Sequence, residues 1–225
     1  MAETLPSGHR GVLIVCQARS MTGRVRATLC VYCGSNAGNG SAFIEMAQSL
    51  GEALANRGVR LVYGGGKVGL MGVLADAVLA GGGEVIGVIP EALRRAEVAH
   101  EGLTQLEIVS SMHERKARMA TLADGFVALP GGFGTFDEVI EMLTWSQLGL
   151  QERSVVFLDV DGFFEPLLAM FDRARDAGFL RASHRMLAQR ALGVDEAIAL
   201  ALAPAPVTSH KWLDRDRSPD LHRDV

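Results

Sequence analysis

Residues 130–138 combine glycines, which leave backbone amides accessible, with a carboxylate that could act on a bound group. The segment reads Pro-Gly-Gly-Phe-Gly-Thr-Phe-Asp-Glu and follows an apolar run at 125–129. Backbone N–H groups at the start of a helix bind anions such as phosphate. A glutamate held beside a bound sugar can stabilise positive charge or deprotonate water. The spacing therefore predicts a phosphate-binding loop with Glu138 facing the ligand.

A structural role for Glu138 fits the same residues. Thr135 and Glu138 have the spacing of a capping box, in which the two side chains satisfy amide groups at the start of a helix. In that case the carboxylate would point back to its own helix. The sequence leaves both interpretations open.

Two more glycine-rich segments follow apolar runs. One is 33–36, which reads Cys-Gly-Ser-Asn, and the other is 63–69, which reads Tyr-Gly-Gly-Gly-Lys-Val-Gly. A single glycine loop is weak support for a ligand site, because glycine also serves tight turns and close packing. Three such loops at successive strand ends predict a site that surrounds a phosphorylated ligand.

The segment 63–69 also matches the G-x-G-x-x-G fingerprint of dinucleotide-binding proteins. That fingerprint needs an acidic residue at the carboxyl end of the next strand, where it binds the ribose. Glu84 stands at the beginning of that strand instead. A nicotinamide-dependent enzyme is therefore disfavoured, but it stays an alternative.

Two adjacent cations lie beside an apolar face of a predicted helix at 111–123. On a helical wheel, Arg115 and Lys116 flank the face that contains Met112 and Met119. Their aliphatic stems could be buried with the charges in water. Alternatively, the charges could meet an anionic ligand at the edge of the sheet.

Short apolar runs alternate along the chain with segments of helical period. The clearest helix is 41–57, which Ser41 can cap and Gly58 ends. Repeated alternation of strand and helix predicts an α/β fold, a parallel sheet with helices on both faces. In such folds the ligand binds at the carboxyl ends of the strands. The predicted strands are 27–33, 60–63, 84–89, 106–109, 125–129 and 154–158.

The alternating pattern occupies residues 27–203, which we predict as a single domain. With 48% hydrophobic residues in a chain of 225, a substantial core can form. Residues 1–26 show no convincing period and are predicted as an extension, with Met21 as a candidate natural start. Residues 204–225 are rich in Pro, Asp, Arg and His, which predicts a solvated tail.

Composition excludes several classes of function. The net charge is −4 and no basic stripe is present, which argues against a nucleic-acid partner. The sequence contains neither an apolar run of membrane-spanning length nor a clear signal peptide, so we expect a cytoplasmic protein without a membrane partner.

The cysteines predict neither disulfides nor a metal site. An odd count of three argues against a disulfide framework. Cys30 and Cys33 form a C-x-x-C pair, but residues i and i+3 of a strand face opposite sides. A zinc site would need a second pair of ligands, and the sequence shows none. We therefore predict two buried thiols.

Four of these segments resemble motifs of the LONELY GUY (LOG) family, cytokinin-activating phosphoribohydrolases that are often labelled lysine decarboxylases. Residues 130–138 are similar to its P-G-G-x-G-T-x-x-E motif, and 111–116, Ser-Met-His-Glu-Arg-Lys, to its second motif. Residues 33–35 and 63–72 resemble two of its loops. The similarity extends over 27–202, with the four motifs in order.

The resemblance implies a Rossmann-like doubly wound fold and a homodimer that needs no cofactor or metal. It implies hydrolysis of the N-glycosidic bond of AMP or an N6-modified adenosine 5′-monophosphate, releasing free base and ribose 5-phosphate. By position it makes Arg115 and Glu138 the catalytic pair. The residues that it assigns to substrate binding are Gly34, Ser35, Gly65, Gly66, Glu97, Met112, Lys116, Gly132, Phe133, Gly134, Thr135 and Thr144.

Two rival functions remain open. A carrier of a nucleotide or cofactor could share the fold and loops without hydrolysis, and a nicotinamide-dependent enzyme could use 63–69. A lysine decarboxylase would need a Schiff-base lysine. Lys67 and Lys116 lie beside phosphate-type loops or other cations, and nothing marks either as a Schiff-base former. Release of adenine from AMP separates hydrolysis from these rivals.

Overall fold

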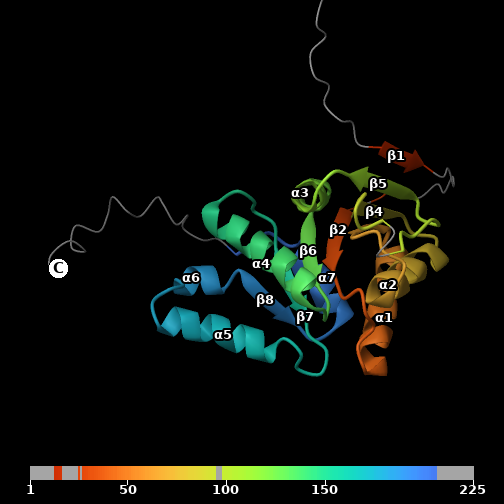
Figure 1. The fold of residues 1–225 in the computed structure, drawn as a ribbon. Helices are drawn as coiled ribbons and strands as arrows, with labels where there is room; N and C mark the ends of the chain where they lie inside the picture. Colours follow the sequence, from red (N-terminus) through yellow and green to blue (C-terminus); the bar gives the residue numbers. More distant parts are fainter. Residues whose placement is uncertain (1–12, 17–24, 26, 95–97, 207–225) are drawn as a thin grey trace, which may run out of the picture.

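The strands form one sheet of eight, shown in Figure 1. The structure, a computed structural model, describes residues 13–16, 25, 27–94 and 98–206. The strand order is β1-β5-β4-β3-β2-β6-β7-β8, and among the described pairings only β1 with β5 is antiparallel. The strands are β1 (Leu13–Cys16), β2 (Ala27–Tyr32), β3 (Val59–Tyr63), β4 (Val85–Pro90), β5 (Gln105–Val109), β6 (Gly125–Ala128), β7 (Val155–Leu158) and β8 (Ala188–Ala191).

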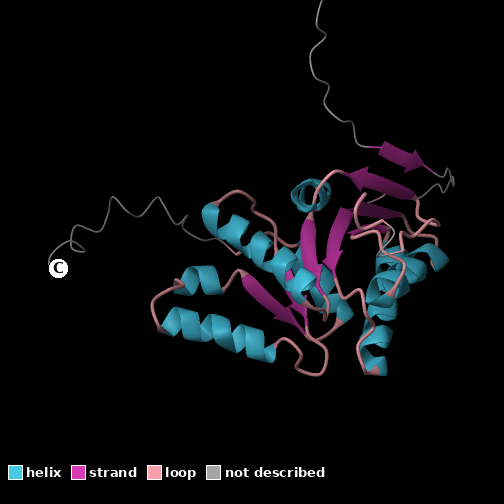
Figure 2. Cartoon of the chain, viewed as in Figure 1, coloured by secondary structure: helices cyan, strands magenta, loops and turns pink. Residues whose placement is uncertain are grey.

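Helices cover both faces of the sheet, as Figure 2 shows. Side chains of α1, α2 and α7 form the hydrophobic core on one face, and side chains of α3, α4 and α5 form the core on the other. The predicted α/β fold with two covered faces is therefore confirmed. The helices are α1 (Ser41–Arg57), α2 (Gly69–Ala80), α3 (Met112–Leu122), α4 (Phe133–Leu148), α5 (Glu165–Asp176), α6 (Ala182–Arg185) and α7 (Val194–Leu202).

The sheet grows in opposite directions from its centre, which makes it doubly wound. From β2 the chain adds β3, β4 and β5 on one side, and it then returns to place β6, β7 and β8 on the other. Ligands of such sheets bind where the direction reverses, outside the carboxyl ends of the strands. The loops after β3, β2 and β6 therefore share the edge at which a site is expected.

The predicted elements agree closely with the structure. All six predicted strands are confirmed to within one residue at each end, and helix 41–57 is confirmed with Gly58 in the left-handed conformation at φ 63°. The prediction that Ser41 caps this helix is wrong. Gly40 is the N-cap residue, and no side chain caps the helix.

Two edge strands were not predicted. β1 lies within the predicted extension 1–26 and pairs with β5, although its four residues alone give no alternation to recognise. β8 reads Ala-Gln-Arg-Ala, which lacks the branched side chains typical of strands, and it pairs only with β7. Met21 lies outside the described residues.

The two thiols diverge as predicted. Cys30 belongs to the core on the α3 and α4 face, whereas Cys33 belongs to the opposite core. Both are buried and free. Among the described residues no helix is long and apolar enough to cross a membrane.

Candidate active site

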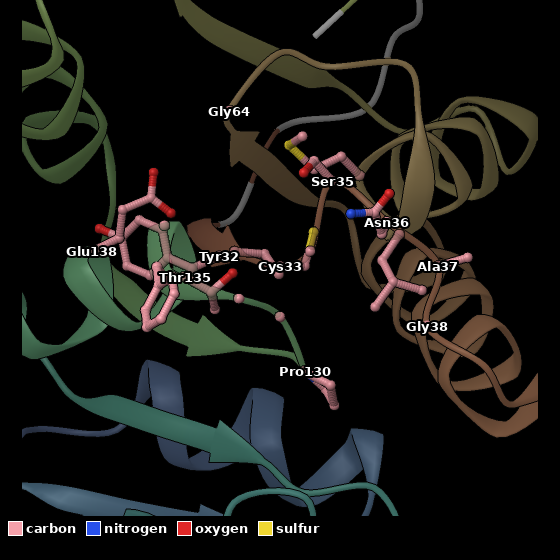
Figure 3. A pocket seen from close by; sticks show the side chains of 18 of the residues that line it. Tyr32, Cys33, Ser35, Asn36, Ala37, Gly38, Gly64, Pro130, Thr135 and Glu138 are labelled. Carbon is pink, nitrogen blue, oxygen red and sulfur yellow. The ribbon is translucent and has the colours of Figure 1, made fainter.

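A cavity of about 370 Å³ opens at the point where the sheet reverses direction. The loops after β2, β3 and β6 line it together with the beginnings of α3 and α4. Figure 3 shows Thr135 and Glu138 of α4 on one side and the loop Ser35–Gly38 on the other. The three glycine-rich loops thus meet at one site, as their positions at strand ends predicted.

Backbone contacts hold these loops together. The Gly34 N–H donates to the Pro130 carbonyl at 3.1 Å, and the Gly34 carbonyl accepts from the Leu70 N–H at 3.1 Å. A Cβ atom on Gly34 would lie 3.3 Å from Gly131 Cα, tighter than most such contacts. Glycine at this position therefore allows the first and third loops to approach.

The start of α4 is open to the cavity. Gly132 is its N-cap residue and no side chain caps it, so amides of the first turn remain available to a ligand. A Cβ atom on Gly132 or Gly134 would meet no atom of the described residues within 4 Å. This helix terminus has the donors, the dipole and the space that a phosphate group needs.

Glu138 lies one turn further along α4. Because the helix starts at Phe133, Thr135 is its third residue and cannot be the N-cap. The capping-box interpretation of Thr135 and Glu138 is therefore wrong, since the helix begins earlier than that spacing requires. Glu138 is 8% exposed and lines the cavity.

Arg115 reaches the same cavity from α3. Its Nε donates to the Val88 carbonyl and its Nη2 to the Gly64 carbonyl, both at 3.1 Å. Nη1 lies 3.7 Å from Met112 Sδ. The side chain is buried, so its charge does not extend into bulk water as a snorkelling residue would place it. The carbonyl of Val88 within β4 and that of Gly64 just after β3 instead fix the guanidinium at the site.

Lys116 turns away from the cavity toward α4. Its Nζ is 2.9 Å from Asp137 Oδ2 and 3.0 Å from Glu141 Oε2. The residue is buried but is not among those that line the cavity. Two adjacent cations of α3 therefore have different surroundings.

Three further titratable side chains lie near the pair Arg115 and Glu138. Burial raises the pKa of the Cys30 and Cys33 thiols far above the usual range, and the charge of Glu138 raises both further. Burial likewise raises the pKa of the Tyr32 phenol. All three therefore stay neutral near pH 7 and are poor nucleophiles.

Sequence comparisons match most of this chain. A family model described as "Possible lysine decarboxylase" matches residues 71–200. LOGL1 of Oryza sativa subsp. japonica, named a probable cytokinin riboside 5′-monophosphate phosphoribohydrolase, is 53% identical over 159 residues, which cover 71% of each chain. LOG2 of Arabidopsis thaliana, a cytokinin riboside 5′-monophosphate phosphoribohydrolase, is 46% identical over 71% of this chain and 75% of its own. The chain belongs to the LOG family.

Solved structures share the fold of this LOG protein. The Moco Carrier Protein from Chlamydomonas reinhardtii is 25% identical, with a TM-score of 0.58 over 77% of this chain and 93% of its own. The molybdenum cofactor binding protein from Rippkaea orientalis is 19% identical, with a TM-score of 0.59 over 79% and 96%. The second likeness concerns the fold alone.

Most of the residues that the LOG resemblance assigned to the site line the cavity. They come from the loop after β2, from α3, and from the loop and helix that follow β6. These segments are distant in sequence but meet at the same edge of the sheet. These residues are Gly34, Ser35, Met112, Arg115, Gly132, Phe133, Gly134, Thr135 and Glu138.

Four other assigned residues, among those that the structure describes, lie outside the cavity lining. Gly65 and Gly66 are covered by the segment 98–100, through a hydrogen bond from the His100 N–H to the Gly65 carbonyl at 2.9 Å and a bridge from Gly66 to Ala99. Lys116 faces α4. Thr144 donates to the Ile140 carbonyl at 2.8 Å and lines a separate groove beside α5 and α6. Glu97 lies outside the described residues.

An aromatic corner of the cavity was not predicted. Phe43 of α1 meets Phe163 edge-on, with ring centroids 6.1 Å apart, and both line the cavity. Phe163 follows β7, so it lies at the same sheet edge as the glycine loops. The position after a predicted strand was a usable signal, but Phe163 carries no charge or motif that would single it out.

Proposed function

We propose that this chain hydrolyses the N-glycosidic bond of AMP or of N6-modified, cytokinin-type adenosine 5′-monophosphates. The observation that carries the proposal is the meeting of Arg115 and Glu138 in one cavity beside an uncapped helix start. LOG relatives 46–53% identical to the chain are named as phosphoribohydrolases of cytokinin riboside 5′-monophosphates. The products would be the free base and ribose 5-phosphate.

The 5′-phosphate fits the beginning of α4. Gly132 and Gly134 leave space there, and amides of the first turn have no intrahelical carbonyl to bind. A phosphate fixed at this point would bring the ribose toward Glu138, which lies one helical turn away on the same helix. Such fixation lowers the entropic part of the barrier.

Glu138 is the proposed catalytic carboxylate. Cleavage of a glycosidic bond builds positive charge on the sugar, which a nearby carboxylate stabilises. Glu138 also accepts a proton from the attacking water as the new C–O bond forms at the anomeric carbon. The electron pair of the broken C–N bond leaves with the base, which takes up a proton.

Arg115 is the proposed partner of this carboxylate. Its guanidinium is anchored by the Val88 and Gly64 carbonyls, so its charge is fixed in the cavity before substrate arrives. A fixed cation favours the ionised form of Glu138 and attracts an anionic nucleotide.

The protein is further proposed to be a cytoplasmic homodimer. The LOG resemblance supports a homodimer, and two free buried thiols suit a reducing compartment such as the cytoplasm. Sedimentation of the purified chain at micromolar concentration tests the first point: a species of twice the 24.0 kDa mass is expected.

Carrier function is the weaker alternative. The neighbours that bind a molybdenum cofactor are 19–25% identical, well below the phosphoribohydrolases. Incubation with AMP and chromatography of the products separates the two functions. Free adenine and ribose 5-phosphate in equal amounts are expected, whereas a carrier would release neither.

Glu138→Gln tests the assignment of the reactive group. Glutamine keeps the shape of the side chain but cannot accept the water proton, so kcat should fall about 10³-fold. Glu45→Gln, an exposed change on α1, serves as the matched control and should keep full activity. Adenine release at wild-type rate by Glu138→Gln, with a normal melting curve, would refute the assignment.

A further inference from the structure

Lys116 is a buried cation whose charge is directed at a helix. Its side chain is 9% exposed, yet it is absent from the cavity that the neighbouring Arg115 lines. Nζ contacts Asp137 Oδ2 at 2.9 Å and Glu141 Oε2 at 3.0 Å. Both partners belong to α4, the helix that carries Glu138.

These partners and Glu138 form one patch of carboxylates. Residues three and four apart are neighbours on a helix surface, so Glu141 adjoins both Glu138 and Asp137. Neighbouring negative charges make ionisation of each carboxyl group harder. Lys116 lies against the two members of the patch that do not line the cavity.

We infer that Lys116 is a positioning residue for Glu138, which holds α4 against α3 and offsets the charges of Asp137 and Glu141. The inference rests on the proposed function, in which ionised Glu138 reacts. It replaces the substrate-binding role that the LOG resemblance assigned to Lys116. In this arrangement Lys116 acts only through α4.

Lys116 keeps its charge despite burial. Burial by itself lowers the pKa of the ammonium, but hydrogen bonds to Asp137 and Glu141 outweigh that effect and raise the pKa above its usual value. The Lys116 ammonium is therefore charged at neutral and acidic pH.

Among the described residues, one further charged side chain lines the cavity beside Glu138. Arg115 on α3 supplies one cation at the cavity. Cys30, Cys33 and Tyr32 of the β2 region stay neutral, because burial raises the pKa of each. Substitution of Lys116, Asp137 or Glu141 should therefore have a larger effect on the pKa of Glu138 than these neutral side chains have.

The charges of Lys116, Asp137 and Glu141 determine the direction in which the pH dependence of activity shifts. Activity requires ionised Glu138 and falls as pH drops through the pKa of that carboxyl group. Loss of Lys116 leaves the charges of Asp137 and Glu141 uncompensated, which raises the Glu138 pKa. The acid limb of the pH profile of kcat/KM, where activity falls at low pH, then moves to higher pH. Loss of the two carboxylates with Lys116 retained moves the limb to lower pH.

Three variants test this balance against pH profiles of kcat/KM for AMP. Lys116→Met should lower kcat about tenfold and move the acid limb up by about one pH unit. The double variant Asp137→Asn/Glu141→Gln should move the limb down. Combining all three changes should return the limb to near its wild-type position, because the charge that Lys116 offsets is then absent.

A lysine that binds substrate would give a different pattern. Lys116→Met would then raise KM, and the triple variant would not be rescued, which would overturn the inference. If Lys116→Met fails to fold, the downward shift of the double variant and the return of the triple variant to the wild-type position still decide. A wild-type protein that releases no base from any purine monophosphate refutes the proposed function instead, so the two failures are distinguishable.

Discussion

Two glycine-rich loops, 63–72 after β3 and 130–135 after β6, look alike in sequence and differ in what surrounds their glycines. In the first loop, a Cβ atom on Gly64 would collide with the Arg115 guanidinium and one on Gly72 with the Lys67 carbonyl. In the second loop, Gly132 and Gly134 have open space around the same position. Gly131 of the second loop resembles the first loop, because its added Cβ atom would collide with the Thr135 side chain, whereas Gly132 and Gly134 leave room beside the cavity.

Glycine-rich segments of similar sequence thus serve different purposes in this protein. The first loop matches a dinucleotide fingerprint, yet its middle glycines are covered by the segment 98–100. Its contribution to the site is Gly64, whose carbonyl anchors Arg115. The second loop presents an uncapped helix start to the cavity. Variants of the two loops should therefore separate stability from binding.

Gly69→Ala should have the largest effect on stability. Gly69 has φ 64°, and an added Cβ atom would collide with the Ser35 backbone. The left-handed conformation and the clash together cost about 3 kcal/mol. For a chain of this size that loss lowers the melting temperature by about 6–12 °C, which calorimetry measures. A melting temperature within about 2 °C of wild type would show that this loop can relax.

Gly134→Ala should maintain or slightly raise stability and weaken binding. The new methyl group meets no atom of the described part of the chain within 4 Å, and alanine favours a helix over glycine by up to about 1 kcal/mol. It does occupy space beside the amides that the phosphate would approach, so KM for AMP should rise about tenfold or more. Steady-state kinetics with a parallel melting curve checks both parts. An unchanged KM would place the phosphate elsewhere and break the contrast between the loops.

Much of the fold was predictable from the sequence because burial leaves a periodic trace. Helix 41–57 has an apolar face with Ala47, Leu50 and Leu54 fully buried, and the central strands are continuous apolar runs. The meeting of the three loops was also predictable, since parallel strands end at a common edge. β8 left no such trace, because its pairing with β7 and not its side chains makes it a strand.

The orientation of single side chains was less predictable. Arg115 and Lys116 are adjacent, so their directions differ by about 100° around α3. A helical wheel shows this angle, but it does not show that Arg115 faces the edge of the sheet and Lys116 faces α4. Likewise, the start of α4 at Phe133 depends on how Gly132 closes the loop, which the Thr135 and Glu138 spacing does not reveal.

Glu84→Gln should have the smallest effect and tests the rival dinucleotide interpretation of 63–72. Glu84 pairs with Arg60 at 2.9 Å from Nε, and both side chains are about one third exposed, so the pair contributes at most about 1 kcal/mol. The pair lies at the amino end of β4, whereas the cavity opens at the carboxyl ends. Kinetics with AMP should be unchanged, and fluorescence titration should detect no NADH binding in either protein. NADH binding by the wild type that Glu84→Gln abolishes would mean that the first loop holds a ligand after all.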